Sequence, residues 1–448
     1  MKNWLCGTAL AAILAPLIAF SARAEDVTTF TLKNGLDVVV LEDHRAPLVV
    51  QMVWYRAGSA DEARGKSGVA HYLEHLMFKG TKTMAPGELS RVVEANGGSD
   101  NAFTSYDYTA YFQSIAADRL PLIMRMEADR MRNLSLTEND WKTERDVIIE
   151  ERNLRTDSDP GAIFHEQLGA AQYLNHPYGT PIIGWRHEME SLTREDALDW
   201  YRLYYAPNDA TLVIAGDVTP EQVKALAEEY YGPLEPSPAI KPRHRVTEPP
   251  QLAERTLVYQ DPRVSQPMLS RSYLAPERNP GDQRTAAALT ILAEALGGNG
   301  QTSVLGRAMQ FGSKTAISTF ASYDGTSLDK TTFNLGVVPA EGVTLEAAEA
   351  EMDSVLADFL KTGISKDQLA RIKTQIEAAD VYSRDSVHGR AMKYGEGLAI
   401  GLTIRDIEDW PGILASITGD EVMAAAHLVL DRRASVTGLM ERGEEATQ

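Results

Sequence analysis

A run of five residues, His71-Tyr72-Leu73-Glu74-His75, combines groups that can hold a metal ion with a group that can move a proton beside it. Histidines at positions i and i+4 share one helix face, with Cβ atoms roughly 5–6 Å apart. Both imidazoles can therefore reach one Zn²⁺ ion at about 2.0–2.1 Å. Glu74 projects beside the same position, where a carboxylate can take a proton from a zinc-bound water whose pKa has dropped to about 7.

A histidine pair with this spacing also occurs on ordinary polar helix faces, so the flanking residues decide how the run is interpreted. Leu73, Leu76, Met77 and Phe78 give the predicted helix an apolar face, and Gly80 is expected to end it. A buried helix that carries two histidines and a carboxylate favours a metal site over a solvated face.

A third metal ligand must come from elsewhere, because a catalytic zinc takes three protein ligands and keeps one open position. The acid-rich segment 139–155 predicts a helix. Glu144 and Glu151 are seven residues apart and share a face of it, whereas Glu150 points about 100° away. Spacing alone does not choose between Glu150 and Glu151 as the ligand.

The order H-x-x-E-H is typical of inverted zinc peptidases. HYLEHLMFKGT followed by ERDVIIEER resembles the pitrilysin, insulysin and mitochondrial-processing-peptidase family. The resemblance implies that Glu151 is the third ligand and that Glu144 supports the site. Two helical turns place Glu144 about 10.5 Å from Glu151, so we expect it to orient a ligand histidine rather than to bind the metal. An exposed helix carboxylate is the alternative for Glu144.

Residues 97–112 predict a glycine turn that leads into a strand. The resemblance implies that this is an edge strand which pairs with an extended substrate, and that the residue at Asn101 contacts the substrate near the scissile bond. Ala102 and Phe103 follow on the same strand as substrate-binding candidates. Strand addition gives affinity through main-chain hydrogen bonds and little sequence selectivity. An ordinary core strand is the alternative.

The first 24 residues predict a secretory signal peptide. Lys2 precedes a short apolar run at 9–20, and Ala22-Arg23-Ala24 is a cleavage motif, so we expect a periplasmic protein that begins at residue 25. Cys6, the only cysteine, lies in this leader. The mature chain is therefore expected to have no disulfide and to rely on its hydrophobic core.

The formal net charge is −19 and becomes two units more negative after the loss of Lys2 and Arg23. So acidic a surface argues against a nucleic-acid partner. The electric field of the negative surface would favour basic peptides, but solubility explains the excess of acidic residues equally well. No segment after the leader approaches the roughly 20 apolar residues of a membrane span.

The mature chain is expected to form two homologous α+β domains, each a sheet faced by helices and related by internal duplication. A proline-rich linker at 236–255 separates a zinc-bearing catalytic domain at 25–235 from a metal-free domain at 256–448. The two halves repeat each other faintly: YLEHLMFKG at 72–80 aligns with LAEALGGNG at 292–300, without the histidines.

The second half departs from the family pattern. Active members carry an Arg and a Tyr seven residues apart after the glycine-rich loop, where they are implicated in holding substrate and stabilising the oxyanion. Alignment on Ser303-Val304-Leu305 places Gln310 and Ile317 at those positions. Arg307 and Tyr323 are nearby but have the wrong spacing. The resemblance therefore implies a homologous partner subunit that supplies the Arg/Tyr pair.

The sequence thus predicts a zinc endopeptidase that hydrolyses peptides inside a closed chamber, as the zinc-bearing subunit of a heterodimer. A non-catalytic scaffold or assembly subunit is one alternative, although a scaffold has no need of Glu74. A processing peptidase dedicated to one precursor is another.

Overall fold

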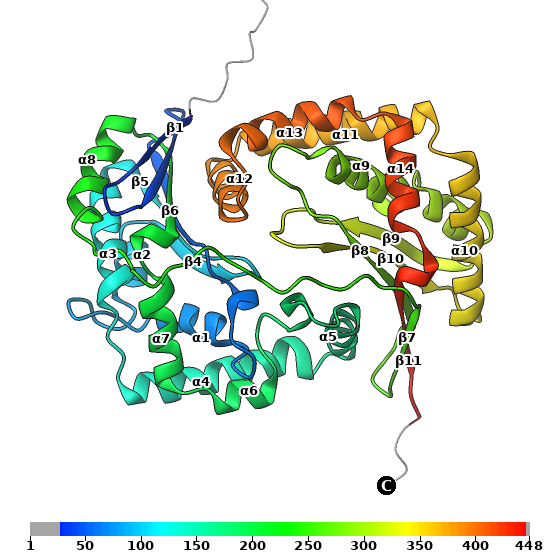
Figure 1. Ribbon diagram of the computed structural model, residues 1–448, viewed down its shortest axis with the longest axis horizontal. Helices are drawn as coiled ribbons and strands as arrows, with labels where there is room; N and C mark the ends of the chain where they lie inside the picture. The colour runs from blue at the N-terminus through cyan, green and yellow to red at the C-terminus, as the bar shows by residue number, and fades with distance from the viewer. Residues whose placement is uncertain (1–26, 445–448) are drawn as a thin grey trace, which may run out of the picture.

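A computed structural model describes residues 27–444, so the predicted signal peptide lies outside the described residues. The chain forms two halves, each built on one sheet with helices packed against it (Figure 1). The predicted α+β fold of two sheets faced by helices is therefore confirmed.

The sheet of the first half has six strands in the order β1-β2-β6-β3-β5-β4. β2 and β6 are parallel, and the other neighbours are antiparallel. The strands are β1 (Val27–Thr31), β2 (Asp37–Glu42), β3 (Leu48–Tyr55), β4 (Ser99–Thr104), β5 (Thr109–Ala116) and β6 (Ala210–Gly216). Gly35 has φ of 91° in the turn between β1 and β2, a backbone conformation that glycine adopts without strain. β4 is an edge strand.

Helices α1, α3, α7 and α8 bury one face of this sheet, including Val53 and Tyr55. The helices of the first half are α1 (Val69–Leu76), α2 (Glu88–Ala95), α3 (Leu120–Asn133), α4 (Glu138–Arg152), α5 (Pro160–Gln172), α6 (Arg186–Ser191), α7 (Arg194–Tyr204) and α8 (Pro220–Tyr230). A π-helical segment at Asn153–Asp157 lies between α4 and α5.

The second half repeats this topology. Its strands are β7 (Arg255–Asp261), β8 (Met268–Ala275), β9 (Ala316–Tyr323), β10 (Thr331–Pro339) and β11 (Ser435–Arg442). Their order, β7-β11-β8-β10-β9, matches β2-β6-β3-β5-β4 strand for strand, including one parallel pair at the same place. The strand order itself thus supports internal duplication.

The helices of the second half are α9 (Arg284–Ala293), α10 (Leu345–Thr362), α11 (Lys366–Arg384), α12 (Val387–Ala399), α13 (Ile404–Ser416) and α14 (Gly419–Val429). Two π-helical segments follow α9, at Glu294–Gly298 and Gly306–Gly312. Within residues 27–444 no single helix is long and apolar enough to cross a membrane, although α13 and α14 pass that test as a pair bent by 104°.

Each half covers part of the other half's sheet with one helix (Figure 1). α12 packs on β3 and β6 of the first sheet, where Tyr394 and Trp54 share one apolar cluster. α5 packs on β7, β8 and β11, and its Phe164 and Leu168 meet Val436. The contact at α12 is close, because a Cβ atom on Gly395 would lie 2.0 Å from the indole nitrogen of Trp54. The two halves are therefore packed into one body.

The segment expected as a linker, 236–255, crosses between the halves without helix or strand until β7 begins. Arg245 anchors it: the guanidinium lies 2.9 Å from Asp61 and 3.2 Å from Asp329, and also pairs with Asp107. Asp61 and Asp107 belong to the first half and Asp329 to the second. Since the side chain of Arg245 is only 6% exposed, this ion cluster ties the linker to both halves.

Candidate metal centre

Helix α1, which carries both histidines, is held at its N-terminus by the half-buried carboxylate of Glu62. Gly68 adopts φ of 89° at the position before the helix. Glu62 accepts hydrogen bonds from the backbone N–H groups of Gly68 at 2.9 Å and Ala70 at 2.8 Å, which satisfies two free donors of the first turn. The helix runs from Val69 to Leu76, because Gly68 places a left-handed residue directly before Val69.

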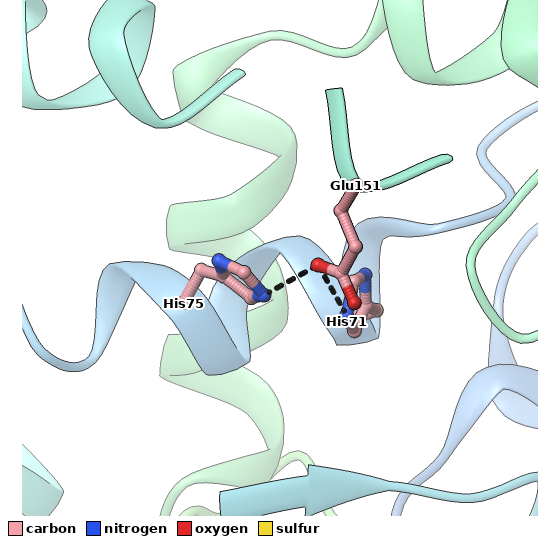
Figure 2. Close-up of side chains that lie close together, drawn as sticks. All are labelled: His71, His75 and Glu151. Carbon is pink, nitrogen blue, oxygen red and sulfur yellow. Dashed lines mark ion pairs between the residues drawn. The ribbon is translucent and has the colours of Figure 1, made fainter. Parts of the chain in front are cut away.

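Three donor atoms converge above this helix (Figure 2). Glu151 Oε2 lies 3.1 Å from His75 Nε2 and 3.6 Å from His71 Nε2, and one ligand atom from each residue falls within 4.8 Å of the others. Donors placed tetrahedrally about 2.1 Å from a zinc ion lie about 3.4 Å apart. Two imidazole nitrogens and one carboxylate oxygen at these separations fit Zn²⁺ with a fourth position open.

The structure distinguishes Glu150 from Glu151, between which sequence spacing could not choose the third metal ligand. Glu151, at the end of α4, faces both histidines, and its other oxygen lies 2.7 Å from Arg155. Glu150 is exposed and accepts a hydrogen bond from Asn153 at 3.0 Å instead. The geometry therefore supports Glu151 as the third ligand, which stays a prediction until metal binding is measured.

Glu74 lies beside the cluster and is not one of its three converging residues. The hydroxyl of Thr104 donates a 2.6 Å hydrogen bond to Glu74 Oε2. Burial raises the pKa of Glu74, and this hydrogen bond opposes the shift. A buried carboxylate with a raised pKa, held by one hydrogen bond, suits a group that must both take up and release a proton.

Glu144 contacts the site through His75. It accepts a 2.9 Å hydrogen bond from His75 Nδ1 and pairs with Lys79. This contact leaves His75 Nε2 turned toward Glu151. Burial acts against protonation of His75, but the hydrogen bonds with Glu144 and Glu151 outweigh it and raise the pKa of His75 to about 9. The geometry fits the expected orienting role of Glu144.

His71 differs from His75 in its surroundings. Its Nδ1 is buried and has no hydrogen-bond partner within residues 27–444. Burial, together with the charge on His75, lowers the pKa of His71 to about 4. At neutral pH His71 is therefore neutral, as a metal ligand must be.

The predicted substrate strand is β4, whose outer edge pairs with no strand of residues 27–444. Ala102 and Thr104 face α1, whereas Phe103 packs on Trp54 with ring centroids 5.4 Å apart, on the face that α12 covers. Asn101 is exposed, and its side-chain oxygen accepts a hydrogen bond from the N–H of Ala102. Contact with a substrate through this strand would thus use the backbone of Asn101–Phe103 more than the Phe103 ring.

The positions expected to carry an Arg and a Tyr lie near one another on the second half. Gln310 donates a 2.9 Å hydrogen bond to Thr319 of β9. Ile317, also on β9, is 57% exposed. Tyr323 is not free to replace the tyrosine expected at position 317, because its hydroxyl donates a 2.6 Å hydrogen bond to the carbonyl of Pro276.

Three residues at the centre were missed by the sequence analysis: Thr104, Lys79 and Arg155. Lys79 follows His75 by four residues and Arg155 follows Glu151 by four, so helical spacing could have indicated both. Thr104 comes from a strand, and no local pattern relates it to Glu74.

Comparison with known proteins identifies the family to which this fold belongs. Residues 37–185 match the model of the insulinase family, peptidase family M16, and residues 191–376 match that of the peptidase M16 inactive domain. The chain is 31% identical over 364 residues to a zinc protease, PqqE, of Helicobacter pylori, covering 80% of each protein.

The chain therefore belongs to the insulinase (M16) family, and the predicted resemblance is confirmed. A crystal structure of a protease from Helicobacter pylori superposes with a TM-score of 0.87 at 27% identity, covering 93% of this chain and 100% of that one. The periplasmic protease PqqL of Escherichia coli shares the fold, with a TM-score of 0.79 at 19% identity, over 94% of this chain and 48% of that one.

Proposed function

We propose that this chain is a zinc-dependent endopeptidase. The convergence of His71, His75 and Glu151 beside Glu74 carries the proposal, because it supplies three metal ligands and a separate acid–base group in one place. When bound, the ion supplies Lewis-acid chemistry at the reacting carbonyl. The name zinc protease given to relatives such as PqqE agrees with this assignment.

Residues of the chain itself carry out proton transfer and substrate binding. Glu74 takes a proton from the attacking water and then passes it to the leaving amine. Thr104, hydrogen-bonded to Glu74, fixes the direction of its carboxylate. The free edge of β4 holds the peptide in extended form through main-chain hydrogen bonds, so that the substrate is oriented with little dependence on its sequence.

We further propose that the chain works as the zinc-bearing subunit of a heterodimer around a closed chamber in the periplasm. Gln310 and Ile317 support this, because Ile317 has no donor and the uncharged amide of Gln310 already donates a hydrogen bond to Thr319, so the two residues do not replace an Arg/Tyr pair. The predicted leader at 1–24, and the likeness in fold to periplasmic PqqL, support the location.

The test compares zinc-loaded wild type with Glu74→Gln on a mixed pool of peptides, with and without a homologous partner. We expect cleavage by wild type, none by Glu74→Gln, and equal zinc content in both. Equal cleavage by the two proteins would remove Glu74 as the base. A wild type that binds zinc and cleaves nothing under any of these conditions would favour the scaffold alternative. Cleavage of one precursor only would favour the dedicated processing peptidase.

A further inference from the structure

The second sheet ends in a strand, β7, whose outer edge is uncovered (Figure 1). Within the described residues β7 pairs only with β11, in a parallel register that has no shift from Arg255 to Asp261. Part of the N–H and C=O groups of an edge strand point away from its one neighbour. No hydrogen bond joins the backbone of residues 256–260 to any segment of 27–444 other than β11. The outer edge of β7 therefore presents a row of free backbone donors and acceptors.

The first sheet covers the equivalent edge. β2 has the place in the first sheet that β7 has in the second, and β1 pairs with the outer side of β2 in antiparallel direction. The described part of the second sheet has no counterpart of β1, because the segment before β7 is tied by Arg245 to Asp61 and Asp107 of the first half. The internal duplication thus leaves a place for one antiparallel strand beside β7.

The residues of β7 do not protect this edge. Natural edge strands are commonly protected by lysine, proline or a β-bulge, and the seven residues of β7 include none of these. Leu257 and Tyr259 turn toward the cluster that contains Phe164 of α5. On the other face, Thr256, Val258 and Gln260 are exposed and uncharged, and Val258 is 54% exposed. Nothing in the middle of the strand therefore opposes the addition of another strand.

The charges at the two ends of β7 make the strand complementary to itself. In an antiparallel pair of two β7 strands centred on Val258, Arg255 of each copy lies opposite Asp261 of the other. A shift of two residues in one direction would place Arg255 opposite Tyr259, and a shift in the other direction would place it opposite Arg263. Opposite charges across an antiparallel pair are stabilising, and like charges are destabilising. Charge complementarity thus favours the register centred on Val258.

Both charged groups can take a further partner. Arg255 forms no ion pair within residues 27–444, and its Nη1 donates hydrogen bonds to the carbonyls of Ala171 at 2.6 Å and Gln172 at 3.1 Å. A guanidinium has five N–H donors, so others stay available. Asp261 pairs with Arg263 at 2.7 Å, but a carboxylate offers about four acceptor positions.

We propose that two copies of this chain pair through β7, in antiparallel direction and centred on Val258, so that their second sheets form one continuous sheet. A contact made by one strand from each copy is small, and the dimer is expected to form at concentrations on the order of 10–100 μM. The pairing needs neither zinc nor cleavage of a peptide, so it is independent of the proposed peptidase function.

A cysteine at the centre of the pair tests the register. Opposite residues of an antiparallel pair have Cα atoms about 4.5 or 5.5 Å apart, and a disulfide spans Cα separations of about 4.4–6.8 Å. In a Cys6→Ser chain, which has no other cysteine, Val258→Cys should become mostly cross-linked dimer on mild oxidation, as non-reducing electrophoresis shows. Val246→Cys is the matched control, because Val246 is a 50% exposed valine of the linker. Cross-linking no greater at position 258 than at position 246 would overturn the proposal.

Charge reversal tests whether Arg255 and Asp261 meet across the pair. Arg255→Glu places like charges opposite one another at both ends of the pair, and so does Asp261→Arg. Each variant alone should weaken the dimer about tenfold or more, as measured by sedimentation. An equimolar mixture of the two variants restores an opposite-charge pair at each end and should dimerise as tightly as wild type. Arg405→Glu on α13, where the arginine side chain is 89% exposed, is the control and should change nothing.

The mixture separates a contact between copies from damage to the fold, since two misfolded variants would not restore each other. A wild type that stays monomeric at about 100 μM would overturn the proposal. A dimer that neither variant weakens, or one that the mixture does not restore, would overturn it as well, because the two copies would then meet through another surface.

Discussion

Glu144 accepts a 2.9 Å hydrogen bond from Nδ1 of His75, and so determines which nitrogen of that ring meets the metal position. With Nδ1 bound to Glu144, Nε2 is the nitrogen that faces Glu151 and the metal position, and it becomes free to bind a metal when it gives up its proton. No comparable partner holds His71 among the described residues. The two histidines on one helix thus differ at Nδ1: that of His75 is bound to a carboxylate, whereas that of His71 has no hydrogen-bond partner among the described residues.

Glu144→Ala is expected to weaken zinc binding about 10–100-fold without changing the stoichiometry at saturating zinc, because His75 loses the group that fixes its orientation. Competition with a chelator measures the affinity. Glu150→Ala is the control, since Glu150 is exposed and turned away from the histidines. Unchanged affinity in Glu144→Ala would reduce Glu144 to an ordinary helix carboxylate.

Substitution of each proposed ligand should abolish tight zinc binding. His71→Ala, His75→Ala and Glu151→Ala each leave two donors of the three, whereas Glu74→Gln leaves all three and should bind one zinc per chain. Metal analysis of the purified, dialysed proteins decides this. Zinc retained in Glu151→Ala but lost in Glu150→Ala would move the third ligand by one residue.

The metal-free protein should lose stability as the pH rises from about 6.5 to about 9. The pKa of His75 is raised to about 9 in the folded chain, above its ordinary value near 6.5, so the folded state holds a proton that the unfolded state releases. The stabilising contribution is complete below pH 6.5 and is lost as the pH passes through the folded pKa. Urea unfolding across this range measures it.

His75→Gln, which cannot titrate, should reduce that slope. Zinc binding should show the opposite trend, becoming tighter as the pH rises, because zinc competes with the proton on His75. A metal-free wild type with the same pH dependence as His75→Gln would contradict the assignment.

Turnover by the chain alone should be low and should rise when an Arg and a Tyr are restored. Removing one oxyanion donor typically costs about 10²–10³ in rate, so we expect the double variant Gln310→Arg/Ile317→Tyr to be at least about tenfold faster than wild type. Kinetics on one peptide, with oligomeric state checked by mass, measure this. Tyr323→Phe serves as the control, because its hydroxyl is bound to Pro276. Full activity of the wild-type chain alone would refute the need for a partner.

Gly395→Ala should destabilise the protein by about 1–3 kcal/mol through overpacking, since the added Cβ would stand 2.0 Å from Trp54. Gly412→Ala on α13 is the matched control, because nothing lies within 4 Å of its added Cβ. There the change should stabilise the helix by about 0.5–1 kcal/mol. Thermal unfolding compares the two. A stabilised Gly395→Ala would mean that α12 can move away from the sheet.

The sequence predicted the features that depend on local spacing. The pattern at His71–His75 and the helix bearing Glu151 follow from short-range spacing, and the duplicated domains follow from the faint repeat of 72–80 at 292–300. The choice of Glu151 over Glu150 needed the direction of α4 relative to α1, which no spacing within α4 contains. Thr104 was missed because its contact with Glu74 joins a strand end to a helix thirty residues earlier in the chain.

The exchange of helices between the halves could not be predicted. An apolar stripe shows that a helix packs against something, but not which sheet it covers. The sequence did not predict helix α5 for a related reason. Phe164 and Leu168 face the second sheet, whereas other residues of the helix, such as His165, line a cavity between the halves, so the sequence shows no continuous apolar face. Gly161 and Gly169 weaken its helical pattern further.

The position of α12 on the first sheet has a consequence for the biosynthesis of the chain. The first sheet is complete once β6 ends at Gly216, but α12 begins only at Val387. Until α12 arrives, the face that carries Met52 and Trp54 has no cover, and an uncovered apolar face invites aggregation. We therefore expect the two halves to acquire their native structure together, late in synthesis or after it, rather than one after the other as each is made.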